Sequence, residues 1–237
     1  METTEPQTMY WLQTYTGKKI DLINPTCEMV DIEDIAHALS MICRFNGHCR
    51  DFYSVAEHSV MVEVIGNQIS LSSEPISEFQ RLALLLHDAA EAYIGDFTTP
   101  LKRGLDSIGS NPSPEKISKI AELERRWLVV IGQAFFLGSQ LAEPSFIMRQ
   151  ADDRALAVEV PTLFHPVQSC WWETRNRPRS GEMMIHCWSP AEARRQFLSR
   201  FRVLYETLHS RKIGWEEVGG VETKEDGPTG PTGGSNL

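Results

Sequence analysis

The sequence lacks the features that mark secreted and membrane proteins. Its five cysteines are odd in number and form no C-x-x-C pair, a pattern that suits the reducing cytosol better than a disulfide framework. No apolar run approaches the roughly 18 residues of a membrane span. The N-terminus METTEPQTMY has neither the basic nor the apolar region of a signal peptide. We therefore expect a cytoplasmic protein that does not bind membranes.

An excess of positive charge is also missing. The 237 residues carry a formal net charge of −9, which argues against binding nucleic acid through one broad basic face. A local basic pocket for a phosphate remains compatible with this charge. With 41% hydrophobic residues the chain can bury a sizeable core, and no internal repeat divides it. The length is long for one domain and short for two.

Helical periodicity dominates the chain and predicts an all-α fold. We expect an N-terminal arm over 1–30, with a small hairpin turning at Gly17, one helical domain over 31–212, and a disordered tail over 213–237. From Gly219 the sequence GGVETKEDGPTGPTGGSNL has no apolar content able to offset the entropy of ordering.

Capping signals predict where the helices begin. These signals are Asp31, Ser54-x-x-Glu57, Ser77-x-x-Gln80, Thr99-Pro100, Pro114, Pro144 and Ser189-x-x-Glu192. We expect loops over 66–76 and 104–114, and an irregular region over 161–188. The tryptophans and arginines at 171–179 within it are interpreted as a surface loop or subunit contact.

The most informative stretch is LLLHDAAEAYIGDFTTPLK, residues 84–102. His87 and Asp88 stand side by side after four apolar residues, where both groups are costly to bury without a partner. A divalent metal is a natural partner, because an imidazole nitrogen and a carboxylate oxygen suit an ion with nitrogen and oxygen ligands. Glu91 follows His87 by four residues, so we expect one helix to turn all three toward one cavity.

Two further residues can complete such a site. His58 lies one turn into a capped helix, between Val55 and Val62 on its apolar stripe. Asp152 follows Ala151 inside an amphipathic helix, where a free carboxylate would be poorly solvated. The order along the chain is therefore His, then His-Asp, then Asp, each on a separate helix.

This order resembles the H…HD…D signature of the HD-domain metal-dependent phosphohydrolases. The matching segments are AEHS at 56–59, LHD at 86–88 and AD at 151–152. HDAAEAYIGDFTTPLK is similar to the HD-x-x-E-x-x-x-G-D-x-x-T-P-x-K run of the bacterial 5′-deoxyribonucleotidases. The upstream CRFNGHCRDFYSVAEHS resembles nucleotide-phosphohydrolase relatives, including viral dATP triphosphohydrolases. The resemblance covers about residues 10–160.

The resemblance implies an HD-domain helical bundle in which His58, His87, Asp88 and Asp152 hold one divalent metal ion. The A-D pattern selects Asp152, with Asp153 as the alternative carboxylate. Two imidazoles and two carboxylates suit Co²⁺, Mn²⁺, Fe²⁺ or Mg²⁺ better than a thiolate-bound zinc. A second Mg²⁺ is compatible with a triphosphate substrate.

The same reading gives roles to nearby residues. Glu91 is a candidate general acid or base, and Asp96 is a candidate to orient or deprotonate the attacking water. Candidates for binding substrate are Arg44, Phe45, His48 and Lys102, the two cations by neutralising phosphate oxygens. Phe52 and Tyr93 are further candidates to stack on a base. Each of these residues also has a plain structural interpretation, as a core, turn or surface side chain.

The predicted activity is hydrolysis of deoxyribonucleoside 5′-phosphates. The upstream segment favours a dNTP triphosphohydrolase of the phage dATP type, whereas the central run favours a 5′-deoxyribonucleotidase acting on dNMPs. A cyclic-nucleotide or alarmone phosphodiesterase shares the ligand set, and a non-catalytic nucleotide sensor is a further alternative. Relatives are often oligomeric, so a homo-oligomer is expected, and the only other partner predicted is the nucleotide.

Overall fold

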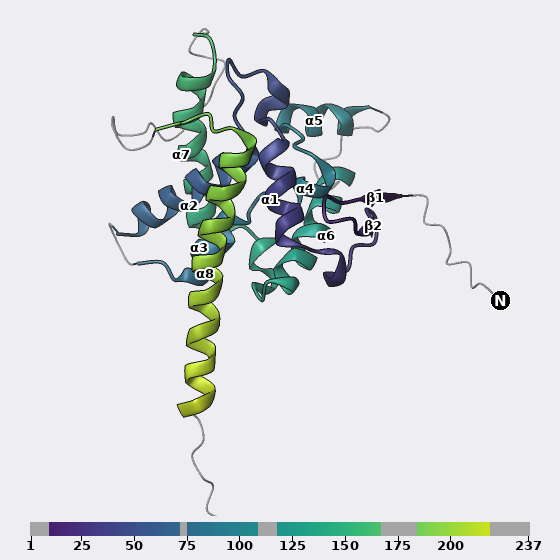
Figure 1. The fold of residues 1–237 in the computed structure, drawn as a ribbon. Coiled ribbons are helices and arrows are strands. Elements are labelled where there is room, and N and C mark those ends of the chain that lie inside the picture. Colours follow the sequence, from purple (N-terminus) through teal and green to yellow (C-terminus); the bar gives the residue numbers. More distant parts are fainter. Residues whose placement is uncertain (1–9, 72–74, 109–117, 167–183, 219–237) are drawn as a thin grey trace, which may run out of the picture.

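A computed structural model describes residues 10–71, 75–108, 118–166 and 184–218 (Figure 1). It confirms the all-α fold class, because helices make up most of the described chain and a single two-stranded hairpin is its only named sheet. The helices are α1 (Ile32–Met41), α2 (Val55–Leu71), α3 (Glu78–Leu85), α4 (Glu91–Ile94), α5 (Thr99–Ser107), α6 (Lys119–Ala134), α7 (Phe146–Leu163) and α8 (Pro190–Val218).

Helix α2 lies at the centre of the packing. It packs against α7, α3, α8 and α1, and α8 runs alongside α1 and α3 (Figure 1). The core is aliphatic at this centre, with Val55, Val62 and Leu82 fully buried. Burial of apolar area contributes roughly 25 cal/mol per Å², so this contact region supplies much of the driving force for folding. No described helix is both long and apolar enough to cross a membrane.

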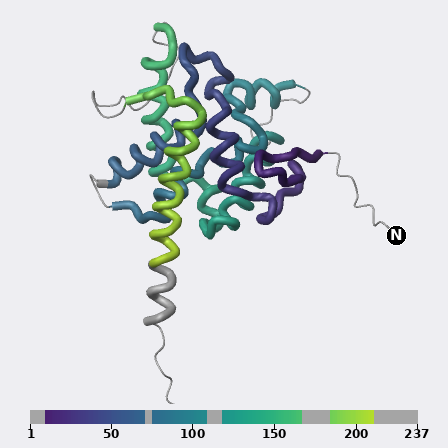
Figure 2. Tube along the Cα trace, in the orientation of Figure 1, coloured from purple at the N-terminus to yellow at the C-terminus, as the bar shows by residue number. Residues whose placement is uncertain are grey.

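The predicted N-terminal hairpin is confirmed. Strand β1 (Trp11–Gln13) pairs antiparallel with β2 (Lys19–Asp21), and Leu12 lies opposite Ile20. Gly17 has φ +88° in the connecting turn, a conformation that L side chains rarely adopt. The hairpin is joined to α1 by the carboxylate of Asp34, which accepts from the backbone N–H of Thr16 at 2.6 Å. It lies on the side of the molecule away from α7 (Figure 2).

Local capping chemistry begins most helices as the sequence predicts. Asp31 accepts from the backbone N–H of Glu33 at the start of α1, and Ser77 and Gln80 form a complete capping box at α3. At α2 the box is half formed. Ser54 accepts from the N–H of Glu57, but the Glu57 carboxylate instead accepts from three backbone N–H groups at 186–188.

Several predicted helix ends are wrong. Helix α2 continues to Leu71 through the predicted loop, because Gly66 lets it pack closely on Leu84 of α3. Helix α5 extends to Ser107 and α7 to Leu163, with Pro161 inside its last turn. Helix α8 reaches Val218, past the end near His209 that the sequence predicts, while the domain boundary at 213 stays a prediction. Residues 219–237 of the tail and the 171–179 cluster lie outside the described residues.

Gly132 of α6 provides a test of the packing. A Cβ atom there would overlap the backbone carbonyl oxygen of Gly138, which cannot move as a side chain can. We expect Gly132→Ala to lower the free energy of unfolding by about 1–3 kcal/mol, the usual cost of overpacking, measured by urea denaturation. Gly104 of α5 has no atom within 4 Å of its Cβ position. Gly104→Ala should therefore raise stability by about 0.5–1 kcal/mol, and equal effects of the two changes would contradict the packing.

Candidate metal centre

The His87-Asp88 pair lies in a turn between two helices. Helix α3 ends at Leu85, residues 86–90 form a turn, and α4 begins at Glu91. The expectation that one helix carries His87, Asp88 and Glu91 is therefore wrong. Hydrogen bonds from the N–H of Ala89 to the carbonyl of Leu86 (3.0 Å) and from the N–H of Glu91 to the carbonyl of Asp88 (3.0 Å) tighten this turn. Buried apolar neighbours anchor it in the core, among them Leu85 and Leu86.

Both imidazoles at the centre have one nitrogen occupied and one without a partner. Nδ1 of His58 lies 2.7 Å from Oε1 of Glu159, and Nδ1 of His87 lies 2.9 Å from the carbonyl oxygen of Leu84. Each Nδ1 faces an acceptor and so carries the proton, which leaves the lone pair of a neutral ring on Nε2. Both Nε2 atoms are buried without a hydrogen-bond partner in the structure. This arrangement is typical of metal-binding histidines, which donate from the other nitrogen to an outer partner.

Carboxylate oxygens face these two nitrogens. Oδ2 of Asp88 lies 3.1 Å from Nε2 of His87 and 3.5 Å from Nε2 of His58. Adjacent ligand atoms about 2.1 Å from one ion and at right angles to each other are about 3 Å apart, close to these separations. Donor atoms of His58, His87 and Asp88 all lie within 4.8 Å of one another, so the three residues can hold a metal ion.

The predicted fourth ligand also lies at the centre. Oδ1 of Asp152, on α7, approaches Nε2 of His58 to 3.3 Å. The alternative carboxylate, Asp153, is exposed. The geometry therefore brings Asp152 next to His58, although Asp152 is not part of the group formed by His58, His87 and Asp88. The four predicted ligands come from α2, α7 and the turn after α3, and the role of Asp152 as a fourth ligand stays a prediction.

The local field favours a positive charge at this centre. Burial and the neighbouring Arg44 lower the pKa of His58, but Glu159 and Asp152 outweigh them and raise it to about 9. Burial opposes ionisation of Asp88, yet His87, His58 and Arg44 together hold its pKa well below the ordinary value. A buried cluster that attracts a proton in this way is also suited to a divalent cation.

Sequence reasoning missed Glu159, which is fully buried on α7. Its carboxylate accepts from His58, from the hydroxyl of Tyr53 at 2.9 Å and from Arg44 at 3.4 Å. Burial opposes a low pKa, but the positive charges of Arg44 and His58 lower the pKa of Glu159. One signal was present in the sequence: Glu159 follows Asp152 by seven residues, which places both on the same face of a helix.

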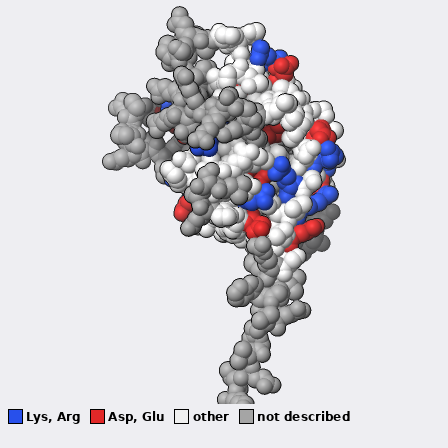
Figure 3. Space-filling model, turned by 90° about the vertical axis from the view of Figure 1, so that its left-hand side faces the viewer, with Lys and Arg blue, Asp and Glu red and all other residues white. Residues whose placement is uncertain are grey.

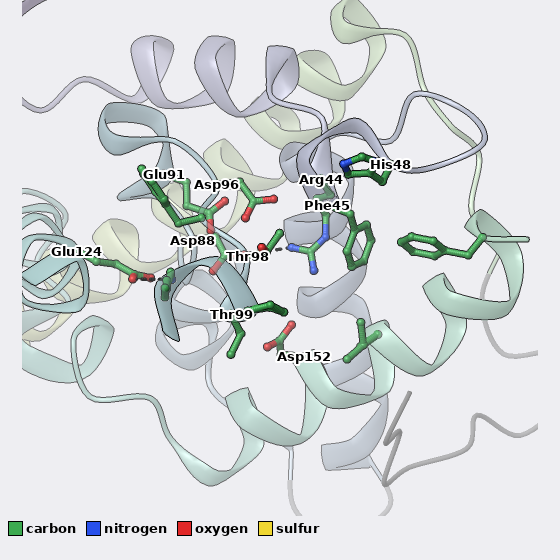
Figure 4. Close-up of a pocket in the computed structure, with 15 residues that line it drawn as sticks. Arg44, Phe45, His48, Asp88, Glu91, Asp96, Thr98, Thr99, Glu124 and Asp152 are labelled. Atoms are coloured by element: carbon green, nitrogen blue, oxygen red, sulfur yellow. Dashed lines mark hydrogen bonds and ion pairs between the residues drawn. The ribbon is translucent and has the colours of Figure 1, made fainter. Parts of the chain in front are cut away.

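A pocket of about 550 Å³ opens at this centre, within the usual range for small-molecule sites (Figure 4). Asp88 and Asp152 contribute to its wall, while the two imidazoles lie behind them. Both predicted catalytic residues and four of the predicted substrate-binding residues also line it: Arg44, Phe45, His48, Glu91, Asp96 and Lys102. Their roles stay predictions, but their convergence from four separate segments on one cavity is observed.

The pKa values of Glu91 and Asp96 are shifted in the opposite direction to those of the candidate ligands Asp88 and Asp152. Burial raises the pKa of Glu91 well above its ordinary value, and the negative charges of Asp88 and Asp96 add to this effect. Oε2 of Glu91 is buried without a hydrogen-bond partner in the structure. Burial also raises the pKa of Asp96. Glu91 is therefore suited to hold a proton beside the candidate metal ligands.

The two cations of the pocket are already paired. Arg44 contacts Asp88 at 3.5 Å as well as Glu159, and Nζ of Lys102 lies 2.8 Å from Oε2 of Glu124 on α6. Glu124 is a pocket residue that the sequence did not single out. In all, five carboxylates line the cavity around these two cations: Asp88, Glu91, Asp96, Glu124 and Asp152.

The aromatic end of the pocket is formed by Phe45 and Phe164, whose rings meet edge to face at 4.9 Å. Phe45 has φ +55°, an uncommon conformation for a bulky residue. The backbone N–H of Phe45 donates a hydrogen bond to the carboxylate of Asp96. This bond ties the short 3-10 helix Arg44–Gly47, which contains Phe45, to the pocket. Tyr93 stacks on Trp127 at 4.0 Å in the core, which agrees with the structural role that the sequence left open for it. Phe52 is not among the residues that line the pocket.

The outer surface gives no sign of a broad basic face on the side viewed in Figure 3. Lysine and arginine side chains there lie interspersed with acidic ones. Ion pairs also join helices, for example Arg194 of α8 with Glu33 of α1 at 2.7 Å. On this face the arrangement agrees with the net negative charge.

Fold and site together define an all-α protein with a candidate metal centre in an acidic pocket. No family model matches the chain. Uncharacterised protein YfdR of Escherichia coli is 31% identical over 200 residues, which cover 84% of this chain and 97% of YfdR. An uncharacterised protein of Rhodobacter capsulatus is 43% identical over 97 residues, 40% of this chain and about half (48%) of that protein. The chain belongs to the same family as YfdR.

Proposed function

We propose that this protein is a metal-dependent phosphohydrolase of the HD-domain type that acts on deoxyribonucleoside 5′-phosphates. The observation that carries the proposal is the pair of buried imidazoles whose free Nε2 atoms face Asp88 and Asp152 at the edge of the pocket. Such a donor set suits Co²⁺, Mn²⁺, Fe²⁺ or Mg²⁺. When bound, a divalent ion would polarise a phosphoryl oxygen and stabilise the charge that develops on it.

The protein's own side chains supply the remaining chemistry. Asp96 orients or deprotonates the attacking water, and Glu91, with its raised pKa, donates a proton to the leaving oxygen. Arg44, held between Asp88 and Glu159, presents its guanidinium to the phosphate. Phe45 and Phe164 form the apolar end against which a base or sugar packs. Cleavage of the phosphorus–oxygen bond by water yields a deoxynucleoside and a free phosphate product.

The charge of the pocket favours monophosphates as substrates. Its two cations are paired, and five carboxylates line the cavity. A phosphate monoester carries about two negative charges at neutral pH, and a triphosphate about twice as many. Without an additional Mg²⁺ the pocket has too little free positive charge for the larger anion. This observation favours the 5′-deoxyribonucleotidase activity over the triphosphohydrolase that the upstream sequence suggests.

Product analysis tests the proposal. Protein loaded with Co²⁺ or Mn²⁺ is incubated separately with the four dNMPs and the four dNTPs, and its products are separated by ion-exchange chromatography. We expect orthophosphate and deoxynucleoside from dNMPs, with at least tenfold slower turnover of dNTPs. Triphosphate released from dNTPs would instead establish the triphosphohydrolase. Metal binding without turnover of any nucleotide would favour a non-catalytic sensor, an alternative that gives Glu91 and Asp96 no role.

A further inference from the structure

We propose that Glu159 is a positioning residue, whose single buried carboxylate fixes His58 as a metal ligand and Arg44 at the pocket wall. The inference rests on the metal centre of the proposed function and does not depend on which phosphate ester is hydrolysed. Glu159 is not part of the ligand pattern in the sequence, because it contacts the ligand His58 and not the metal position itself.

Three donors from separate segments converge on the Glu159 carboxylate. Oε1 accepts from Nδ1 of His58 at 2.7 Å and from the hydroxyl of Tyr53 at 2.9 Å. Oε2 accepts from Nη2 of Arg44 at 3.4 Å. Glu159, His58 and Tyr53 are all fully buried, so these hydrogen bonds are not readily replaced by water.

The first consequence concerns the tautomer of His58. An ionised carboxylate only accepts hydrogen bonds, so the nitrogen that faces it must carry the proton. In the neutral ring the lone pair is then on Nε2, which lies 3.5 and 3.3 Å from Asp88 and Asp152. Carboxylate partners of this kind also make an imidazole a more basic ligand. Glu159 thereby fixes Nε2, and not Nδ1, as the nitrogen of His58 that is offered to a metal ion.

The second consequence concerns Arg44. Its guanidinium spans two carboxylates, with Nη1 at 3.5 Å from Asp88 and Nη2 at 3.4 Å from Glu159. Asp88 is itself a candidate metal ligand. Because Glu159 also holds the guanidinium of Arg44, Asp88 does not have to position this arginine alone and can bind an ion. Loss of the Glu159 charge should therefore disturb the metal centre through both His58 and Asp88.

Glu63 provides a matched control for the loss of a buried carboxylate. It is also fully buried, lies on α2 five residues after His58, and is paired with Arg81 and Arg200. No imidazole contacts it among the hydrogen bonds of the described residues. Glu63→Gln should therefore lower the stability of the fold, because it removes a buried charge. It should leave the metal affinity unchanged.

The test is a Co²⁺ titration of the metal-free protein. Binding is monitored through the visible absorption of the bound Co²⁺, and the affinity is measured by competition with a chelator. In Glu159→Gln the amide must turn its NH₂ toward either His58 or Arg44. We expect its Co²⁺ affinity to fall about 10- to 100-fold, the usual effect of losing an outer partner, with an altered absorption spectrum. Glu63→Gln should retain the wild-type spectrum and an affinity within threefold, although its thermal midpoint falls.

A folded Glu159→Gln protein with wild-type affinity and spectrum would overturn the inference. If that variant does not fold, Glu159→Asp takes its place, because it keeps the charge but withdraws it by one methylene; unchanged affinity there overturns the inference equally. Wild-type protein that takes up no Co²⁺ would refute both the inference and the proposed function. Weakened Co²⁺ binding in the variant, with no phosphatase activity in the wild type, would support the inference and refute the proposed function alone.

Discussion

Replacement of Asp88 by alanine is expected to remove both metal binding and hydrolysis. Oδ2 of Asp88 approaches Nε2 of both His58 and His87, so its removal takes away the oxygen atom that lies between the two imidazoles. The loss of metal affinity should exceed the 10- to 100-fold effect typical of outer partners. Turnover should fall in parallel, because the phosphoryl charge would no longer be stabilised. Metal content by mass spectrometry and phosphate release under one set of conditions measure the two effects.

Asp153→Ala is the matched control for this change. Asp153 is exposed and stands next to the candidate ligand Asp152 on α7. Its removal should leave metal content and turnover within about twofold of wild type, as surface changes generally do. An Asp88→Ala protein that retains one ion per chain and normal turnover would show that the metal centre is assigned to the wrong residues.

The second large effect is expected from Glu91→Gln. Glutamine has the shape of glutamic acid but cannot donate the acid proton, so kcat should fall by about 10²- to 10⁴-fold. Co²⁺ affinity should change little, because Glu91 is not among the residues whose donor atoms form the cluster. Burial raises the pKa of Glu91, and a general acid acts in its protonated form. Wild-type turnover should therefore decline as pH rises through that pKa, and this decline should be absent in the variant.

Steady-state kinetics across pH measure this prediction, with Glu122→Gln as the control. Glu122 is a surface carboxylate paired with Arg125 and Arg126. A Glu91→Gln protein with wild-type kcat would remove the assignment of Glu91 as the general acid. A loss of metal equal to the loss of kcat would instead make Glu91 a ligand.

The parts of the fold that the sequence predicted depend on local chemistry. Asp31 and Ser77 cap helices by bonding to backbone groups two or three residues away, so their effect is visible in a short window. Gly17 marks the hairpin turn for the same reason. Helix ends were less predictable, because they depend on contacts with other helices. For example, α2 continues beyond Gly66, and this glycine packs closely against Leu84 of α3.

The candidate site divides in the same way. The grouping of His58, His87 and Asp88 was predictable, because charged and imidazole groups within apolar stripes need a partner. The turn that carries His87 and Asp88 was not, since the apolar run before it continues the helical pattern. Glu159 was missed because its role arises from contacts with residues 101 and 115 positions away. The pairing of Lys102 with Glu124 likewise exists only in the folded protein.

The most direct test of the proposed metal centre is Co²⁺ uptake by the metal-free wild-type protein, measured by isothermal titration calorimetry. The proposed centre predicts one tight site per chain, lost in Asp88→Ala and retained in Asp153→Ala. Phosphate release from a dNMP should appear on addition of that one equivalent and disappear with a chelator. No uptake of Co²⁺, Mn²⁺, Fe²⁺ or Mg²⁺, or nucleotide hydrolysis that persists in the metal-free protein, would contradict the account.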